Sequence, residues 1–85
     1  MKHEVVHIPE RRMFTVTENG ETAYAEYTVK DGVFDIIHTY VPAELRGNGL
    51  AGDLVEAAYG FAESSGLKLK GSCTYASFWL LRHQK

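Results

Sequence analysis

The sequence predicts an α+β fold, in which a mixed, mostly antiparallel five-stranded sheet carries one main helix and a short C-terminal helix. Strand-like runs separated by turn residues fill residues 4–41. After residue 48 the apolar spacing changes to the period of an amphipathic helix, and a short strand-like run and a helical run follow. This order of elements is typical of a sheet with a helix packed on one face.

Four strand-like runs open the chain. An Asn-Gly pair at residues 19–20 readily adopts the positive φ angles of a two-residue hairpin turn, and an Asp-Gly pair at residues 31–32 marks a second tight turn. Pro9 and Pro42 end the first and the fourth run, because proline cannot donate a hydrogen bond to a strand ladder. The expected strands cover residues 4–8, 12–17, 22–29 and 33–41.

The main helix is expected over residues 49–65, where apolar side chains form one stripe and acidic side chains point away from it. Gly66 suits the position just after a helix. A fifth strand over residues 67–72 and a short helix over residues 75–83 complete the chain. The strands before and after the main helix should be parallel neighbours, because the helix forms the crossover between them.

Length and composition restrict the class of protein. The 85 residues allow one domain, and a chain of this size buries only about 60% of its unfolded surface. A hydrophobic content of 45% is ordinary for a globular protein, and a net charge of −2 without a basic stripe argues against nucleic-acid binding. We expect no membrane span, because no apolar run reaches roughly 18 residues. One cysteine excludes an internal disulfide and suits a reducing compartment, so a cytoplasmic location is expected.

The turn before the main helix is the strongest functional signal. Gly47 and Gly49 carry no Cβ and precede helical N–H groups that lack partners and lie at the positive end of the dipole. A phosphate can therefore approach the backbone closely. Arg46 fits this, because an arginine at a helix start is unfavourable unless an anion balances it. Asn48 is expected to cap the helix when no ligand is bound.

Two common phosphate-binding patterns do not fit this turn. A Walker loop needs a lysine directly after its last glycine, and Leu50 stands after Gly49. A dinucleotide fingerprint could use Gly47, Gly49 and Gly52, but Gly52 falls inside the expected helix, and no partner strand with an acidic end follows. A plain glycine-rich connection is the alternative in which nothing binds.

The segment Arg46-Gly47-Asn48-Gly49-Leu50-Ala51 resembles the Arg/Gln-x-x-Gly-x-Gly/Ala signature of the GNAT superfamily of acetyl-CoA-dependent N-acetyltransferases. The preceding Val41-Pro42-x-x-Leu45 is similar to the lead-in from that family's fourth strand. The resemblance implies that residues 1–85 form a single, minimal GNAT-like domain whose loop amides hold the pyrophosphate of coenzyme A. Typical members place helices that wall the acceptor site between their first two strands. Only residues 9–11 lie there in this chain, as in the very small single-domain GNAT-like proteins.

The resemblance also implies where the rest of acetyl-CoA lies. In the family the fourth and fifth strands splay apart beside the phosphate loop, and the thioester lies between them. Backbone groups of the fourth strand would hydrogen-bond the pantetheine arm, and an N–H there would polarise the thioester carbonyl. The expected cofactor-binding residues are Thr39, Tyr40, Val41, Arg46, Gly47, Asn48, Gly49, Leu50 and Ala51.

Two residues beside the fifth strand are candidates for catalysis. Cys73 follows this strand and precedes the C-terminal helix, whose dipole favours a thiolate. It either accepts the acetyl group or protonates the departing CoA thiolate, and the alternative is a small buried apolar residue. Tyr75 competes for the acid role, since many GNAT enzymes use a tyrosine from this region, or it is a core aromatic residue of the helix.

His38 is the candidate general base for the acceptor amine, whose proton must leave before attack. The alternating pattern of its strand places it on one face with Phe34, Ile36 and Tyr40, so an ordinary sheet histidine is the other possibility. Asp35 and Glu26 are weaker candidates for the base. The remaining histidines do not converge with Cys73 on a metal-ligand spacing, and no metal is expected.

Acetyl-CoA is therefore the expected cosubstrate. The chain is expected to bind it and to transfer the acetyl group to an unidentified amine, either a small molecule or a protein amine. A non-catalytic CoA-binding or regulatory module is the alternative, because the helices that wall the acceptor site are missing. An interaction domain without a cofactor is a third. No nucleic acid or membrane is expected as a partner.

Overall fold

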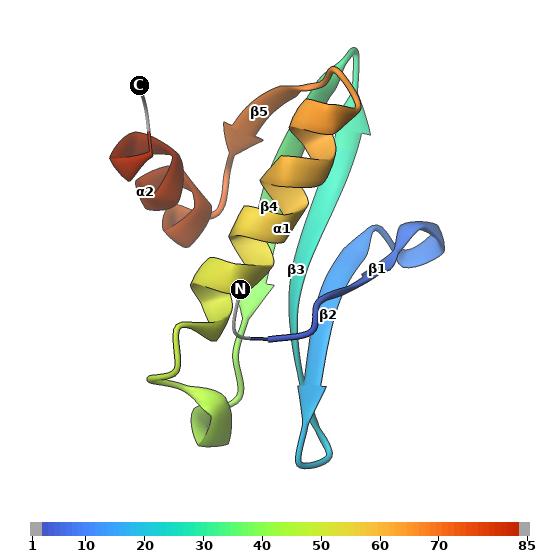
Figure 1. The fold of residues 1–85 in the computed structure, drawn as a ribbon. Helices are drawn as coiled ribbons and strands as arrows, with labels where there is room; N and C mark the ends of the chain where they lie inside the picture. The colour runs from blue at the N-terminus through green and yellow to red at the C-terminus, as the bar shows by residue number, and fades with distance from the viewer. Residues whose placement is uncertain (1–2, 84–85) are drawn as a thin grey trace.

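The computed structural model describes residues 3–83, and its five strands form one sheet in the order β1-β2-β3-β4-β5 (Figure 1). Neighbouring strands are antiparallel except β4 and β5, which are parallel as expected. The strands are β1 Val6–Ile8, β2 Met13–Glu18, β3 Glu21–Lys30, β4 Val33–Tyr40 and β5 Lys68–Gly71. The helices are α1 Leu50–Ser64 and α2 Thr74–Arg82, and the short 3-10 turns are η1 Pro9–Arg11 and η2 Ala43–Leu45.

These elements confirm the α+β fold class, and their bounds differ from the expected ones by one or two residues. The two 3-10 turns had no counterpart in the sequence pattern. Among residues 3–83, no helix is both long and apolar enough to cross a membrane.

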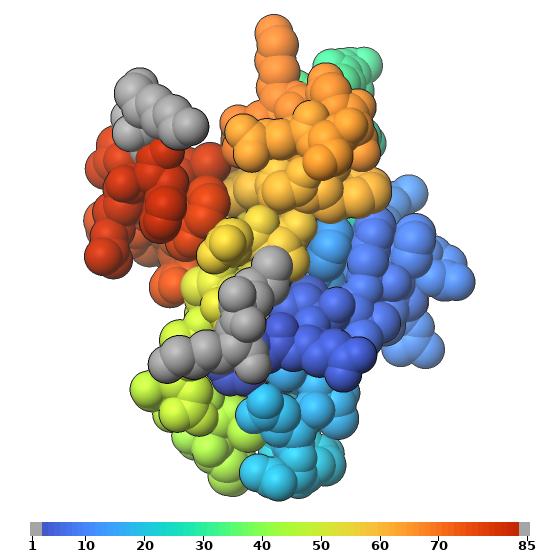
Figure 2. Space-filling view, in the orientation of Figure 1, coloured from blue at the N-terminus to red at the C-terminus, as the bar shows by residue number. Residues whose placement is uncertain are grey.

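The core lies between α1 and one face of the sheet. Figure 2 shows α1 with the N-terminal segment on one side and α2 on the other. The sheet contributes aromatic, β-branched and alanine side chains, and α1 contributes its apolar stripe. The buried residues are Phe14, Val16, Ala23, Ala25, Tyr27, Phe34, Ile36, Leu45, Leu50, Leu54, Val55, Ala58, Tyr59, Ala62 and Ala76.

Helix α2 lies on the same face of the sheet as α1. Gly71 pairs with the buried Ile36, and a Cβ on Gly71 would lie 2.8 Å from the backbone nitrogen of Ser77 in α2. The ring of Trp79 in α2 lies 5.5 Å from that of Tyr59 in α1. Within the part of the chain that the structure describes, both helices therefore cover one face and leave the other face open.

Strand β4 contains a β-bulge at Ile37. Tyr27 of β3 pairs with Ile36, and its neighbour Glu26 pairs with His38, so Ile37 is an extra residue in β4. A bulge of this kind interrupts the alternation of side chains between the two faces of a sheet. Residues of β4 after Ile37 therefore lie on the face opposite to the one that strict alternation predicts.

The bulge corrects the expected position of His38. Thr39 pairs with the buried Ala25 and lies on the helix-covered face, whereas His38 and Tyr40 lie on the open face. The prediction that His38 shares a face with the core residue Phe34 is wrong for this reason. His38 and Tyr40 do share a face of the sheet, as predicted, because both residues follow the bulge.

Candidate functional site

The pairing between β4 and β5 ends before β4 itself ends. The ladder between β4 and β5 ends at the pair Ile36 and Gly71, and the N–H of Cys73 then donates to the carbonyl of Ile36 at 3.0 Å. Strand β4 continues to Tyr40, and among residues 3–83 it has no strand partner on this side after Ile36. Beyond the end of the β4–β5 ladder, Thr39 Oγ1 lies 3.3 Å from Cys73 Sγ.

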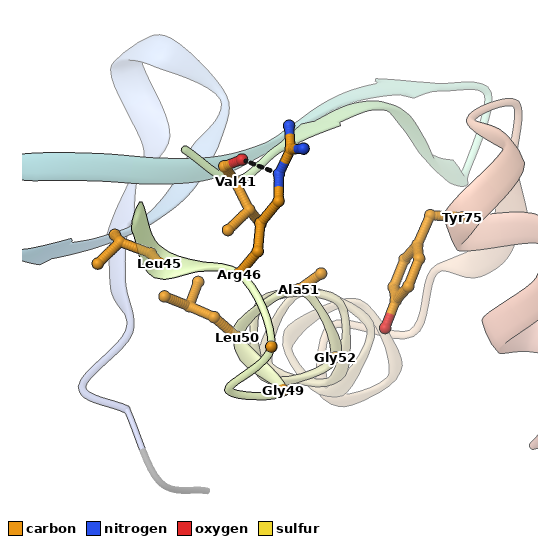
Figure 3. Close-up of a pocket in the computed structure, with 9 residues that line it drawn as sticks. Val41, Leu45, Arg46, Gly49, Leu50, Ala51, Gly52 and Tyr75 are labelled. Atoms are coloured by element: carbon orange, nitrogen blue, oxygen red, sulfur yellow. Dashed lines mark hydrogen bonds between the residues drawn. The ribbon is translucent and has the colours of Figure 1, made fainter. Parts of the chain in front are cut away.

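A pocket of about 160 Å³ lies beyond the end of β4, against the turn that leads into α1 (Figure 3). Val41 follows β4 on one side and Tyr75 projects from α2 on the other. The lining consists of Val41, Leu45, Arg46, Gly47, Gly49, Leu50, Ala51, Gly52 and Tyr75. Six of the nine residues expected at the cofactor therefore line one pocket, whereas Thr39, Tyr40 and Asn48 do not.

The glycine turn has the backbone geometry that its sequence suggests. Gly47 has a φ of 88° and Gly49 a φ of 72°, angles that other residues adopt only with strain. No neighbouring atom lies within 4 Å of where a Cβ on either glycine would stand, so the space in front of the turn is open. The turn therefore exposes its backbone to the pocket.

Gly49, and not Asn48, is the N-cap residue of α1, so the prediction that Asn48 caps the helix is wrong. The left-handed conformation of Gly49 places Asn48 one position outside the helix. Gly49 has no side chain that could cap the first turn of α1. The N–H groups of that turn have no partner within the helix and carry its positive partial charge, which is the arrangement that binds anions elsewhere.

Arg46 is held beside the end of β4. Its Nε donates to the carbonyl oxygen of Val41 at 3.0 Å, and Figure 3 shows the side chain extending from the turn to that carbonyl. Leu45 is buried in the core, which fixes the turn to the sheet. Leu45 and Gly52 line the pocket, although the sequence pattern did not assign them to the cofactor site. The apolar character of Leu45 was the only sequence signal for its position.

Cys73 has a local environment that favours the thiolate. Burial by itself would raise the pKa of the thiol, but hydrogen bonding outweighs this, and the pKa is lowered from its ordinary value. The groups responsible are the Thr39 hydroxyl and the backbone N–H groups of Ala76, Tyr75 and Thr39. Cys73 is also the N-cap residue of α2, where the helix dipole acts in the same direction.

Tyr75 stands in the first turn of α2, two residues after Cys73, and forms one wall of the pocket. Its hydroxyl lies 3.4 Å from where a Cβ on Gly52 would stand, so the ring rests against the first turn of α1. Figure 3 shows this hydroxyl pointing toward the start of that helix. Cys73 and Tyr75 therefore lie on the same side of the sheet, Cys73 against Thr39 and Tyr75 at the pocket.

The candidate bases lie elsewhere. His38 is exposed on the open face, opposite Glu26 in the β3–β4 ladder and 5.6 Å from the ring of Tyr24. The Asp35 carboxylate accepts hydrogen bonds from the backbone N–H and the hydroxyl of Ser72, at 2.8 and 2.7 Å. The structure thus brings Thr39, Cys73 and Tyr75 together on one face and leaves His38 on the other.

The other histidines have structural partners. His3 Nδ1 lies 2.7 Å from a carboxylate oxygen of Asp53 in the first turn of α1. The ring of His7 stacks on Phe14, and its Nε2 lies 2.7 Å from the hydroxyl of Tyr27. Among the described residues, no group of three or more His, Cys, Asp or Glu side chains is arranged to hold a metal ion.

Comparison with known sequences adds an independent line of evidence. Residues 12–85 match the family model described as GCN5-related N-acetyltransferase. Protein NATD1 from Gallus gallus is 38% identical over 76 residues, which cover 85% of this chain and 68% of that protein. Protein NATD1 from Homo sapiens is 39% identical over 75 residues, which cover 84% of this chain and 66% of that protein. The chain thus spans about two thirds of the length of these relatives.

Comparison with solved structures gives the same result. The NMR solution structure of a GCN5-like protein from Staphylococcus aureus superimposes with a TM-score of 0.71 and 29% sequence identity. The superposition covers 96% of this chain and 82% of that chain. The two proteins therefore share their fold over nearly all of the present sequence.

Proposed function

Because this chain belongs to the GCN5-related N-acetyltransferase family, we propose that it binds acetyl-CoA and transfers the acetyl group to an amine. One observation carries the proposal: the pocket at the glycine turn comes directly after the contact between Thr39 and Cys73, along both β4 and α2. Val41 follows Thr39 by two residues, and Tyr75 follows Cys73 by two residues. Val41 and Tyr75 both line the pocket. A long ligand that is anionic at one end can therefore reach from the turn to the Cys73 thiol.

The residues around the pocket suit the anionic end of acetyl-CoA. Gly47 and Gly49 leave the approach to the backbone open, and Gly49 has no side chain to compete for the first N–H groups of α1. These N–H groups would hold the pyrophosphate, as helix N-termini do in other phosphate sites. Arg46 adds a positive charge at the same turn. Its bond to Val41 uses Nε, so its position is fixed relative to the end of β4.

The unpaired end of β4 suits the other end of the ligand. The backbone N–H of Thr39 is one of the groups that lower the pKa of Cys73, so it points toward the Cys73 sulfur. A backbone donor aimed at the reacting group can stabilise the negative charge that develops on a carbonyl oxygen during attack. In our proposal this N–H polarises the thioester carbonyl, and the backbone from Thr39 to Val41 orients the pantetheine arm.

Acetyl transfer then needs two proton movements. The neutral amine nitrogen attacks the carbonyl carbon, a C–N bond forms and the C–S bond breaks. The proton that the amine loses passes to a base or to water, and the CoA sulfur takes a proton from Cys73 or Tyr75. A covalent route is the alternative at the same position: the Cys73 thiolate accepts the acetyl group from CoA and passes it to the amine.

A non-catalytic CoA-binding module is the second candidate function. The three residues of η1, Pro9–Arg11, are all that lies between β1 and β2 apart from Arg12. Nothing in that segment can form a wall around an acceptor. A protein that only binds CoA would need the glycine turn and Arg46 but would not need the thiol of Cys73.

The experiment that separates these functions combines a binding and a turnover measurement. Calorimetry with acetyl-CoA tests for binding, and release of free CoA thiol in the presence of polyamines, amino acids or lysine peptides tests for transfer. Binding together with amine-dependent thiol release is expected. Binding without release for any amine would favour the CoA-binding module, and absence of binding at millimolar acetyl-CoA would overturn both. Intact-mass measurement after incubation with acetyl-CoA alone distinguishes the routes, because only the covalent one adds an acetyl group to Cys73.

A further inference from the structure

We propose that Tyr75 binds the pyrophosphate of acetyl-CoA, with its hydroxyl donating a hydrogen bond to a phosphate oxygen, and that it is not the acid that protonates the CoA sulfur. The inference rests on the proposed function, because it requires acetyl-CoA in the pocket at the glycine turn. Of the two candidate acids, only Cys73 then remains at the reacting end.

The Tyr75 hydroxyl lies beside the part of α1 that would hold the phosphates. Its oxygen is 3.4 Å from where a Cβ on Gly52 would stand, and Gly52 belongs to the first turn of α1. The N–H of Asp53 donates to the carbonyl of Gly49, which closes that turn. The N–H groups of the helical residues before Asp53 therefore have no partner within the helix. The residues that carry them line the same pocket as Tyr75.

The Tyr75 hydroxyl is available for a ligand. Among residues 3–83 it has no hydrogen-bond partner. By contrast, the hydroxyl of Tyr27 lies 2.7 Å from a ring nitrogen of His7, and that of Tyr59 donates to the carbonyl of Lys70 at 2.6 Å. Figure 3 shows the Tyr75 side chain extending from α2 toward the first turn of α1. A phenol donates well to an anion, because hydrogen bonds to charged acceptors are roughly twice as strong as neutral ones.

The same placement removes Tyr75 from the reacting end of the ligand. The proposed thioester lies at the contact between Thr39 and Cys73, whereas the Tyr75 hydroxyl points to the start of α1. In acetyl-CoA the whole pantetheine arm separates the pyrophosphate from the sulfur. A phenol has only one proton to donate, so a hydroxyl that is bonded to the pyrophosphate cannot also protonate the CoA thiolate.

Tyr75 complements Arg46 at this site. Arg46 is fixed toward the end of β4 by the bond from its Nε to the carbonyl of Val41, and Tyr75 projects from α2. Figure 3 shows the two side chains on different sides of the start of α1. A pyrophosphate has several acceptor oxygens, and the two side chains and the helical N–H groups would approach it from different directions. The phenol adds a donor there without adding a charge.

Calorimetric titration with acetyl-CoA tests the assignment without requiring turnover. Tyr75→Phe removes the hydroxyl and keeps the ring. Tyr24→Phe is the matched control, because Tyr24 pairs with Tyr40 on the open face of the sheet. We expect Tyr75→Phe to bind acetyl-CoA about tenfold more weakly than the native protein, and Tyr24→Phe to bind it with native affinity. Thermal melting checks that both variants are folded.

Phosphorus NMR of the saturated complexes identifies the part of the ligand that loses a contact. Bound acetyl-CoA gives separate signals for the pyrophosphate and for the 3′-phosphate of the ribose. In Tyr75→Phe the pyrophosphate signals should differ from those of the native complex, and the 3′-phosphate signal should not. A role of the ring in packing alone predicts no difference, because the ring is kept.

The outcomes separate this assignment from the proposed function. Native affinity of Tyr75→Phe for acetyl-CoA would overturn the assignment and leave the proposed function standing. Weaker binding with unchanged pyrophosphate signals, or with a change in the 3′-phosphate signal alone, would overturn it as well. If acetyl-CoA does not bind to the native protein, the proposed function fails, and the role of Tyr75 fails with it.

Discussion

The hydroxyl oxygen of Thr39 lies 3.3 Å from the sulfur of Cys73, and this contact joins the end of β4 to the start of α2. The two residues are 34 positions apart in the chain. The bulge at Ile37 brings Thr39 onto the helix-covered face, and the end of β5 at Gly71 releases the chain to place Cys73 opposite it. The single thiol of the protein therefore lies where the proposed thioester would be.

Replacing Thr39 with valine should make Cys73 less reactive. The variant keeps the shape of the side chain but removes one of the hydrogen bonds that lower the pKa of the thiol. Alkylation requires the thiolate, so its rate increases with pH around the pKa of the thiol. We expect the midpoint of this increase to lie at a lower pH in the native protein than for a free cysteine. In Thr39→Val the midpoint should lie at a higher pH than in the native protein. Iodoacetamide labelling followed by mass spectrometry measures this without ambiguity, since the chain has one cysteine. Equal midpoints in the two proteins would contradict the assignment.

Gly52→Ala should separate ligand binding from stability. The added methyl group would enter the pocket wall next to the Tyr75 hydroxyl. Gly60→Ala is the matched control in the same helix, because that position faces open solvent. Both changes should stabilise α1 by up to about 1 kcal/mol. We expect only Gly52→Ala to weaken acetyl-CoA binding, by several-fold in calorimetry. Unchanged affinity in Gly52→Ala would show that the ligand does not use this part of the pocket.

Gly71→Ala should destabilise the fold. A Cβ there would lie 2.8 Å from the backbone nitrogen of Ser77, so α2 must move away from β5. We expect the free energy of unfolding in urea to fall by about 1–3 kcal/mol, the range for overpacked sites. Because Cys73 precedes α2, its alkylation rate should change as well. A variant with native stability and native thiol reactivity would contradict the close approach of α2.

His7 should make stability depend on pH. Burial lowers the pKa of His7, and the Glu10 carboxylate offsets this only in part. The unfolded chain therefore binds more protons than the folded one as pH falls below about 6.5, and stability decreases in that range. We expect His7→Phe, which keeps a ring against Phe14, to lose less stability than the native protein between about pH 7.5 and pH 5. Urea unfolding at both pH values measures the difference, and identical losses would contradict the prediction.

The fold could be predicted because each local signal agrees with the others. The Asn-Gly and Asp-Gly turns fixed the hairpins, and Gly20 and Gly32 do adopt positive φ angles. The apolar stripe of the main helix also matched its buried face, with Leu54, Val55 and Ala58 fully buried. The parallel neighbours β4 and β5 followed from the helical crossover between them. Signals of this kind depend on neighbours in the sequence, which is why they can be read without coordinates.

The candidate site was less predictable, because it depends on features without a local signal. The run from residue 33 to residue 41 contains two adjacent isoleucines, Ile36 and Ile37, but such a pair does not by itself specify a bulge at Ile37. The bulge results from pairing with β3, and it decides the face on which His38 lies. Likewise, the approach of Tyr75 to Gly52 joins elements that are distant in sequence. The glycine turn itself was predicted, except that the helix begins after Gly49 and not after Asn48.

Calorimetric titration with acetyl-CoA of the native protein, Gly49→Ala and Gly32→Ala tests the central claim most directly. Gly49 and Gly32 have φ angles of 72° and 77°, and at neither position does a neighbouring atom lie within 4 Å of where an added Cβ would stand. Both variants therefore carry a similar backbone strain of roughly 1 kcal/mol. Only Gly49 of the two lines the proposed pyrophosphate site. We predict binding to the native protein and to Gly32→Ala, and at least about tenfold weaker binding to Gly49→Ala. No binding to the native protein, or equal affinity in all three, would contradict the claim.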